Sequence, residues 1–223
     1  MLINPFYFAR KGLAARMAEW GGQITGRTLD IGCGTKPYQH FCRSSEYIGL
    51  ELDSEESRSA SLADCFYDGR RIPFGDAEFD SVLSNQVLEH VFHPGEFLDE
   101  IRRVVKPGGM ILLTVPFTWD EHEAPRDYAR YTSYGLKFLL REHGFEVLEF
   151  VKTMCDVRAV FQLLNLYLNS KLKTGQPILN LFLRMLLISP LNIMGEILGN
   201  IAPRYDRLYL DNVVLARRSD IAG

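Results

Sequence analysis

Short apolar runs alternate along the chain with segments whose apolar residues recur at helical spacing. Six runs have the length and composition of strands: residues 27–31, 47–51, 63–66, 79–84, 110–115 and 145–151. Helices are predicted at residues 5–20, from near Pro37, at 96–105, and from a Ser133 cap to about Glu142. Because the run 110–115 is apolar throughout, it suits a parallel sheet covered on both faces. The alternation predicts a doubly wound α/β fold.

The stretch 157–202 has a different pattern. It is rich in apolar residues, and its only charged residues are Arg158, Lys171, Lys173, Arg184 and Glu196. We expect two or more helices here, divided at 175–177 and again at Pro190, because glycine and proline interrupt helices. Residues 208–216 return to strand character. The predicted architecture is therefore a Rossmann-like, mostly parallel seven-stranded sheet with a helical insertion before the last strand.

Composition narrows the classes of partner. The net charge is −3, so the chain lacks the basic excess that nucleic acid binding requires. The cysteines follow no zinc-binding spacing and are interpreted as reduced thiols, and no metal is expected: Cys33, Cys42, Cys65 and Cys155. The best candidate for a membrane span, 178–201, contains Arg184, Pro190 and Glu196, so no spanning helix is expected. These features favour a cytoplasmic protein. Peripheral association with a membrane is the alternative location.

Two features predict a nucleotide-type ligand at the ends of the first two strands. Gly32 and Gly34 follow the first strand directly, where side chains would block close approach of a ligand to the backbone. Glu51 ends the second strand, about 20 residues after the glycines. In nucleotide-binding folds, a carboxylate at this position binds the ribose hydroxyls. We assign Asp53 instead to the N-cap region of the next helix, beside Ser54. NAD is disfavoured because Pro37 stands where its fingerprint needs a third glycine.

Ordered motifs resemble those of the class I S-adenosylmethionine-dependent methyltransferases, in particular the type 11 group. The matching segments are 29–35, Glu51, 68–74, 79–82, 87–91 and 106–113. The resemblance implies that S-adenosylmethionine is the cofactor. It implies cofactor contacts by Asp30, Gly32, Cys33, Gly34, Glu51, Asp68, Gly69, Asn85 and Gln86. Many members have another glycine at Lys36; because this lysine precedes a proline, we expect it to avoid positive φ.

The loop 118–132, after the fifth strand, carries the candidate catalytic residues. His122 is the candidate general base, because imidazole titrates near neutrality. Asp127 is expected to orient it or to bind substrate, and Arg130 to hold an acidic group of the substrate. The alternative is that an Asp127–Arg130 pair only orders the loop. His90 is a weaker candidate base, and His93 is interpreted as a turn residue.

The resemblance implies methyl transfer to a small-molecule, glycan-related or lipid-linked acceptor, and we expect the acceptor atom to be oxygen. DNA bases and protein glutamines are disfavoured, because Asn85 and Gln86 are not followed by the proline pair typical of enzymes that methylate exocyclic amines. The alternative is a non-catalytic S-adenosylmethionine-binding structural or regulatory protein. A single domain is expected, with an N-terminal helix (1–25), a cofactor-binding core (26–156), the insertion (157–202) and a terminal strand (203–223). Lid, homodimer interface and membrane contact remain alternatives for the insertion.

Overall fold

The computed structural model describes residues 2–172 and 174–219. The chain divides into two compact units. The sheet unit consists of Ala15–Pro116, His122–Val151 and Asn212–Gly223. The helical unit consists of Met1–Ala14, Phe117–Glu121 and Lys152–Asp211. Each unit is described by itself below.

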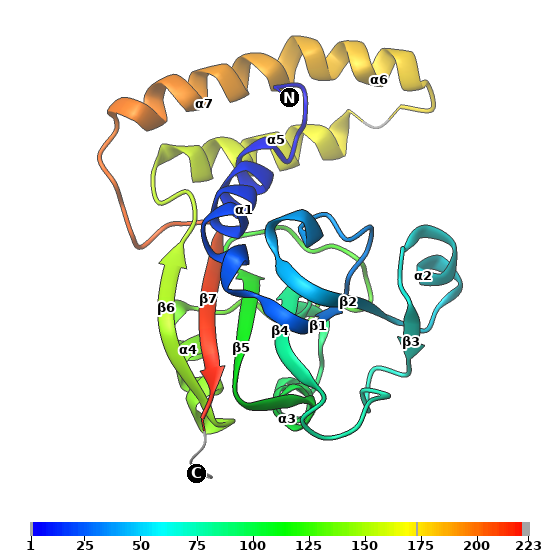
Figure 1. Ribbon diagram of the computed structural model, residues 1–223. Coiled ribbons are helices and arrows are strands. Elements are labelled where there is room, and N and C mark those ends of the chain that lie inside the picture. The colour runs from blue at the N-terminus through cyan, green and yellow to red at the C-terminus, as the bar shows by residue number, and fades with distance from the viewer. Residues whose placement is uncertain (1, 173, 220–223) are drawn as a thin grey trace. The chain divides into compact units, whose positions relative to one another are not determined.

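Seven strands lie within the described residues and form one sheet, in the order β3-β2-β1-β4-β5-β7-β6. The strands are β1 (Thr25–Ile31), β2 (Arg43–Leu52), β3 (Cys65–Tyr67), β4 (Phe79–Asn85), β5 (Val105–Pro116), β6 (Phe145–Lys152) and β7 (Asp211–Arg218). β1 pairs in parallel with β2 and β4, and the pairs β2–β3 and β4–β5 are also parallel. β7 runs opposite to β5 and β6 (Figure 1). The predicted Rossmann-like, mostly parallel sheet is confirmed.

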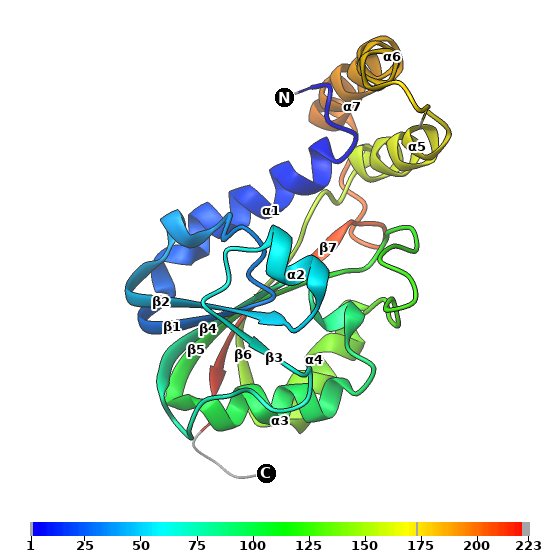
Figure 2. The same cartoon turned by 90° about the vertical axis from the view of Figure 1, so that its right-hand side faces the viewer.

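The sheet is covered by helices that present an apolar face. α3 (Pro94–Val104) and α4 (Ser133–Glu142) lie on the same side of it (Figure 2). They bury Phe97, Ile101 and Leu140 with strand residues in one core cluster. Five further helical segments of the described residues belong wholly or partly to this unit: α1 (Tyr7–Trp20), the short α2 (Glu55–Ala60) and 3₁₀ turns at Gly21–Gln23, Gln39–Phe41 and Leu88–His90.

Two local expectations are corrected, and a third, an N-cap region at Asp53 and Ser54, is confirmed. No α-helix begins near Pro37; the described chain there makes turns and a single 3₁₀ turn, Gln39–Phe41. The N-cap of α4 is Thr132 instead of Ser133, because the Thr132 hydroxyl accepts the N–H of Gly135 at 3.1 Å. The N-cap of α2 is Ser54, whose hydroxyl accepts the N–H of Ser57, while Asp53 pairs with Arg58 at 2.6 Å.

In the helical unit, α5 (Val157–Lys171) packs against a long helix made of three segments. These are α6 (Pro177–Leu183), a π-helical turn (Arg184–Ile188) and α7 (Ser189–Ile201), which together make a continuous helix of 25 residues. The predicted division at Pro190 is therefore wrong. A proline ring collides with the carbonyl four residues back, and the wider π turn, in which the N–H of Ser189 donates to Arg184, makes room for it.

Buried amides fix one face of this long helix. Asn192 is fully buried and donates to two backbone carbonyls of residues 2–4, at 2.6 and 3.1 Å. Asn165 of α5 donates to the Asn192 side chain at 2.7 Å. Gln162, also on α5, bonds three backbone groups of residues 5–9. These bonds determine which side of the long helix faces α5 and the N-terminal segment.

The opposite side of the long helix is exposed and apolar. Only 17% of its most apolar 18-residue window is buried, and by length and composition alone the helix could cross a membrane. The helix passes this test because Pro190 does not interrupt it, and the expectation that no helix spans a membrane stays a prediction. The large exposed side chains include Ile178, Phe182, Leu186, Ile193, Ile197 and Ile201. They recur at spacings of four or seven residues, which places them on one stripe.

The cap of α4 provides a test of the local fold. Thr132→Ala should lower the free energy of unfolding by about 1 kcal/mol, because the N–H of Gly135 loses its partner. Thr132→Ser keeps a hydroxyl and should retain most of that free energy. Urea unfolding followed by circular dichroism measures both variants. Equal stability of the alanine and serine variants would contradict the cap assignment.

Candidate active site

A sharp turn follows β1 at its carboxyl end. Gly32 (φ +70°) and Gly34 (φ +50°) both adopt the left-handed region that favours glycine. A Cβ atom on Gly32 would lie 2.3 Å from Cγ2 of Val87, whereas one on Gly34 would meet nothing within 4 Å. Gly32 is therefore required for packing of the turn, and the open space at Gly34 leaves its backbone accessible to a ligand.

Glu51 lies against this turn from the neighbouring strand β2. The Gly34 N–H donates to Oε1 of Glu51 at 2.6 Å. Cys33, between the two glycines, is 2% exposed, and burial raises the pKa of its thiol to about 12. Its side chain is therefore a packing group at neutral pH. The structure brings Gly32, Cys33, Gly34 and Glu51 together, and their contacts with the cofactor stay a prediction.

Asp30 is a buried carboxyl group beside the same turn. Burial raises its pKa to about 7, and the charge of Glu51 acts in the same direction. The Tyr47 hydroxyl donates to Oδ2 of Asp30 at 2.7 Å and opposes this shift. Near neutral pH, Asp30 therefore exchanges a proton in a site next to Glu51. Its side chain is directed to Tyr47, and cofactor contact by Asp30 stays a prediction.

Lys36 has a φ of +52°, so the expectation that it avoids positive φ is wrong. Two interactions hold it there. Its N–H donates to the carbonyl of Cys33 at 2.7 Å, and its ammonium group pairs with Asp64 at 2.6 Å. They offset the cost of a left-handed residue, which is roughly 1–2 kcal/mol.

Asp68 and Gly69 form the turn after β3. The exposed carboxylate of Asp68 accepts the N–H groups of Arg70 (2.9 Å) and Arg71 (3.2 Å), which holds its pKa below the usual range. Gly69 has a φ of +82°. The carboxylate is thus engaged with its own turn, and adenine binding by this segment stays a prediction.

The carboxyl end of β4 is fixed to β5 through Thr114. The Thr114 hydroxyl donates to Oδ1 of Asn85 at 2.7 Å, and the Gln86 N–H donates to the Thr114 carbonyl at 3.0 Å. Gln86 has a φ of +56°, so the chain bends sharply as it leaves the strand. Because β4 is parallel to β1, this bend lies at the same edge of the sheet as the glycine turn. Contact of Asn85 and Gln86 with the cofactor stays a prediction.

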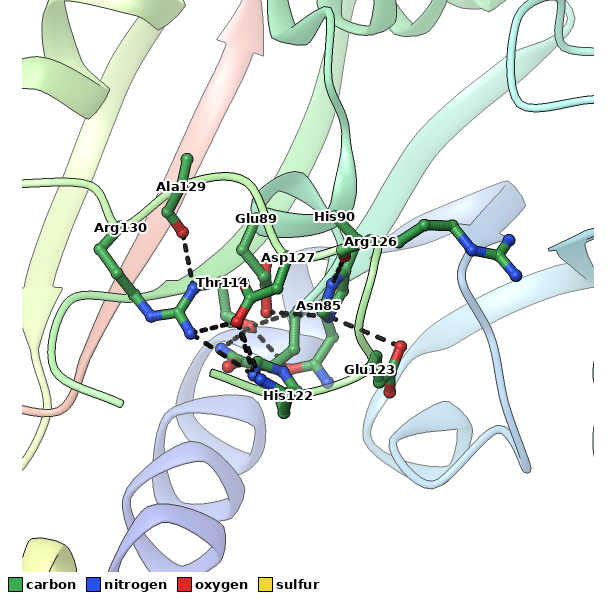
Figure 3. Close-up of polar contacts among 11 residues, drawn as sticks. Asn85, Glu89, His90, Thr114, His122, Glu123, Arg126, Asp127, Ala129 and Arg130 are labelled. Atoms are coloured by element: carbon green, nitrogen blue, oxygen red, sulfur yellow. Dashed lines mark hydrogen bonds and ion pairs between the residues drawn. The ribbon is translucent and has the colours of Figure 1, made fainter. Parts of the chain in front are cut away.

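The candidate catalytic residues form one cluster around a nearly buried carboxylate (Figure 3). Asp127 accepts two hydrogen bonds from the Arg130 guanidinium, at 2.6 and 2.7 Å. It also accepts the backbone N–H of His122 at 2.9 Å, and Nδ1 of His122 lies 3.4 Å from Oδ2 of Asp127. The guanidinium holds the pKa of Asp127 at about 2. Asp127 therefore stays ionised and orients both His122 and Arg130.

A second group, Glu89 and His90, faces this cluster from the turn after β4. The rings of His90 and His122 lie edge to face, with centroids 4.8 Å apart. Nε2 of His90 lies 3.9 Å from Oε1 of the fully buried Glu89 and 3.7 Å from Oε2 of Glu123. Backbone hydrogen bonds from Tyr128 and Ala129 to the Glu89 carbonyl tie the loop to this turn. His93 lies at the N-cap position of α3, before Pro94, as its interpretation as a turn residue requires.

Glu89 was not singled out from the sequence as a functional residue. Its signal is an acidic residue within an otherwise apolar run, Val87-Leu88-Glu89-His90-Val91. Carboxylates are seldom fully buried unless they are paired or bind a ligand. The proximity of Glu89 to His122 arises from tertiary structure, because 33 positions separate them, and no local pattern encodes it.

Comparison with known protein families covers the glycine turn, Glu51 and the turn after β4, but not the loop 118–132. Residues 29–113 match the family model described as a methyltransferase domain. The malonyl-acyl-carrier protein O-methyltransferase of Erwinia pyrifoliae is 36% identical over 95 residues, which cover 40% of this chain and 36% of that protein. The chain thus spans well under half the length of this curated relative.

Solved structures share the fold over most of the chain. The cyclase SpnF has a TM-score of 0.58 and 20% identity, and covers 93% of this chain and 80% of its own. Phosphoethanolamine N-methyltransferase 2 of Haemonchus contortus, in complex with S-adenosylmethionine, has a TM-score of 0.57 and 18% identity, over 95% of this chain and 53% of its own. At these identities the likeness concerns the fold alone.

The position of Glu51 gives the first test of the site. Glu51→Ala should weaken S-adenosylhomocysteine binding by about 10-fold or more, because a charged acceptor for ribose hydroxyls is lost. Asp53→Asn is the matched control: two residues further on, Asp53 is engaged with Arg58 and should leave binding unchanged. Isothermal titration measures both variants. Unchanged affinity for Glu51→Ala would remove Glu51 from the cofactor site.

Asp30 predicts a pH dependence of stability. The folded state holds the Asp30 proton up to about pH 7, whereas the unfolded chain releases it near pH ~4. The stability that this group contributes is therefore present at low pH and is lost as the pH rises to about 7. Urea unfolding between pH 5 and 8 should show wild type losing stability relative to Asp30→Asn. A difference that does not change with pH would contradict the raised pKa of Asp30.

The match of 29–113 to the family model carries the assignment. It confirms the predicted methyltransferase family for this segment, while the activity of the whole protein and its cofactor, S-adenosylmethionine, stay predictions. Residues 29–113 of the chain therefore belong to a methyltransferase domain.

Proposed function

We propose that the protein transfers the methyl group of S-adenosylmethionine to a hydroxyl oxygen of its acceptor. The observation that carries this proposal is the cluster of two histidines and acidic groups at the carboxyl edge of the sheet, where His122 is oriented by an ionised Asp127. A hydroxyl group must lose its proton as it is methylated, and a base supplies this step. An amine or a thiol can react without such a base.

His122 is the proposed base. Its side chain is 30% exposed, so an acceptor can reach it, while the Asp127 side chain is 6% exposed and fixes its backbone and ring. The E. pyrifoliae relative is named as an O-methyltransferase, which supports oxygen as the acceptor atom. The H. contortus neighbour is named as an N-methyltransferase, so the fold by itself does not select the atom.

Arg130 supports this base through Asp127. Its guanidinium makes a bidentate pair with Asp127, and its Nη2 lies 3.4 Å from Nδ1 of His122. Arg130 is expected to bind an acidic group of the acceptor. To do so, its guanidinium must bind that group and Asp127 at the same time. The alternative in which the pair orders the loop is compatible with the same geometry. The two roles differ in whether Arg130→Lys changes acceptor affinity.

We further propose that the acceptor is lipid-linked and that the helical unit lies on an anionic membrane surface. The large exposed side chains that form the stripe of the long helix, from Ile178 to Ile201, are all uncharged. The one acidic residue of that helix, Glu196, is paired with Lys11 and with Arg158. Exposed basic residues flank these helices in the sequence: Lys171 ends α5, and Arg204, which pairs with Asp206, and Arg207 follow α7.

This surface suits a lipid interface better than a membrane crossing. Asn192 and Asn165 are buried on the inner face of the hairpin and bond the N-terminal segment, so one side of the helix is committed to protein. A helix with one apolar side lies in the plane of the interface, where each buried large side chain contributes roughly 1.5–3 kcal/mol. The alternative is that a second copy of the chain covers the same stripe in a homodimer. Vesicle flotation distinguishes the homodimer from the membrane surface.

The base is tested with tritium-labelled S-adenosylmethionine and two acceptor pools, a bacterial glycolipid extract and the oligosaccharides released from it. Transfer to the glycolipid pool should exceed transfer to the free oligosaccharides. His122→Ala should lower turnover 10²–10⁴-fold and leave S-adenosylhomocysteine affinity unchanged. His143→Ala, whose ring pairs with Asp99 elsewhere in the sheet unit, is the control. Normal turnover in His122→Ala, or label on nitrogen, would contradict the proposal.

The lipid surface is tested by flotation with vesicles that contain phosphatidylglycerol. Wild type should float with the vesicles, and Phe182→Asp combined with Leu186→Asp should bind at least 10-fold more weakly. Tyr134→Asp, at an 85% exposed aromatic residue on α4, is the matched control and should bind as wild type does. Absence of vesicle binding, with a dimer in solution that the double variant dissociates, would overturn the membrane assignment in favour of the homodimer.

A further inference from the structure

Three side chains of the sheet unit bring metal-ligating atoms together. Glu89 and His90 lie on the 3₁₀ turn Leu88–His90 after β4, and His122 lies in the loop after β5. One ligand atom from each of them lies within 4.8 Å of the other two (Figure 3). Two histidines and a carboxylate are the ligand set of many catalytic zinc sites and of non-haem iron sites. Because three ligands leave coordination positions open, such a site can also take a substrate atom.

The hydrogen bonds around His90 favour the tautomer that a metal requires. Nδ1 of His90 lies 2.5 Å from the backbone carbonyl of Arg126. A carbonyl oxygen only accepts, so Nδ1 carries the proton and Nε2 keeps its lone pair. Nε2 is the atom that faces Oε1 of Glu89, at 3.9 Å. Metal-binding histidines characteristically donate their other nitrogen to a carbonyl or carboxylate in this way.

His122 has the corresponding partner on its own side. Its Nδ1 lies 3.4 Å from Oδ2 of Asp127 and 3.4 Å from Nη2 of Arg130. The Asp127 carboxylate accepts a proton from Nδ1, whereas the Arg130 guanidinium only donates. Metal binding at Nε2 of His122 therefore requires Asp127 to be the partner of Nδ1. The arrangement carboxylate–histidine–metal is a common one in zinc enzymes. His90 therefore has the required tautomer before any ion arrives, and His122 has a carboxylate within reach that can hold the same one.

The local charge also suits a cation. Glu89, Glu123 and Asp127 contribute three carboxylates within this loop and turn, and Arg130 pairs with one of them. Glu89 is fully buried, and buried carboxylates in proteins are paired or coordinate metals. Zinc bonds of about 2.0–2.1 Å place neighbouring ligand atoms about 3.3 Å apart. The 3.9 Å between Glu89 and His90 must therefore contract by roughly half an ångström, and a spacing of 4.8 Å, the upper limit within the cluster, by about 1.5 Å.

We propose that Glu89, His90 and His122 bind one divalent transition metal ion, of the zinc or manganese class, which holds the acceptor hydroxyl. This inference rests on the proposed oxygen-directed function and deepens it, since His122 then serves as a ligand and the ion acidifies the hydroxyl. The O–H bond breaks and its proton passes through Glu123, which is exposed, to water. The oxygen then forms the bond to the methyl carbon as the carbon–sulfur bond breaks. Sulfur keeps that electron pair, giving S-adenosylhomocysteine.

The test measures metal binding directly. Chelator-treated full-length protein is titrated with Zn²⁺, and with Co²⁺ as a spectroscopic probe. Wild type should bind one ion per chain, and Co²⁺ should give visible absorption bands characteristic of nitrogen and oxygen ligands. His122→Gln and Glu89→Gln should each weaken binding at least 10-fold. His143→Gln, at a histidine–aspartate pair outside the cluster, should bind as wild type does.

Two readouts keep the outcomes separate. S-adenosylhomocysteine affinity reports whether each variant is folded, and His122→Gln is the informative variant if the buried Glu89→Gln fails to fold. Wild type that binds no ion, or a His122→Gln variant that binds as tightly as wild type, overturns the metal site. Methyl transfer to oxygen without bound metal would then leave His122 as the base. Stoichiometric metal binding without oxygen methylation would instead leave the metal site and remove the proposed function.

Discussion

The parallel pairing of strands around β1 is the constraint on which the rest of the site depends. β1 lies between β2 and β4, with Ile31 opposite Leu50 on one side and Ser84 on the other. β5 continues the register, with Asn85 opposite Thr114. Because parallel strands end at the same edge, four separate turns of the chain meet there. The glycine turn, Glu51, the Asn85–Gln86 bend and the loop with His122 are brought to one edge by this order alone.

Within that edge, hydrogen bonds between segments and within the loop hold several of the groups in place. Glu51 is held by the Gly34 N–H, Asp127 by Arg130, and the Glu89 carbonyl by two amides of the following loop. Each of these bonds joins segments that come from different strand ends or from different positions of a loop. Positioning of this kind matters for methyl transfer, because an in-line displacement requires acceptor, methyl group and sulfur to be aligned.

The helical unit buries polar side chains and exposes apolar ones, which is the reverse of the usual pattern in globular proteins. Its polar side chains, Gln162, Asn165 and Asn192, are buried and bonded, while large apolar side chains from Ile178 to Ile201 are exposed. On a surface that faces water such a stripe is unfavourable. Large exposed apolar areas mark sites of interaction with other molecules. The same chain thus combines a polar site on the sheet unit with an apolar surface on the helical unit, and this combination is the basis for proposing a lipid-linked acceptor.

The sequence predicted those features that local pattern encodes. Apolar runs marked all seven strands, and the spacing from Gly34 to Glu51 placed a carboxylate against the turn. The predictions that failed depend on interactions outside the local sequence pattern. Lys36 takes positive φ because of Asp64, and Pro190 continues a helix because a π turn precedes it. Glu89 and His122 meet only through the pairing of β4 with β5, so no local pattern could join them.

The central claim is that the carboxyl edge of this sheet binds S-adenosylmethionine. Isothermal titration of the wild-type protein with S-adenosylmethionine and with S-adenosylhomocysteine tests it most directly. The account predicts that both bind one to one, in the micromolar range. Absence of binding by either compound, in protein that unfolds cooperatively, would contradict it and would leave the fold without its cofactor.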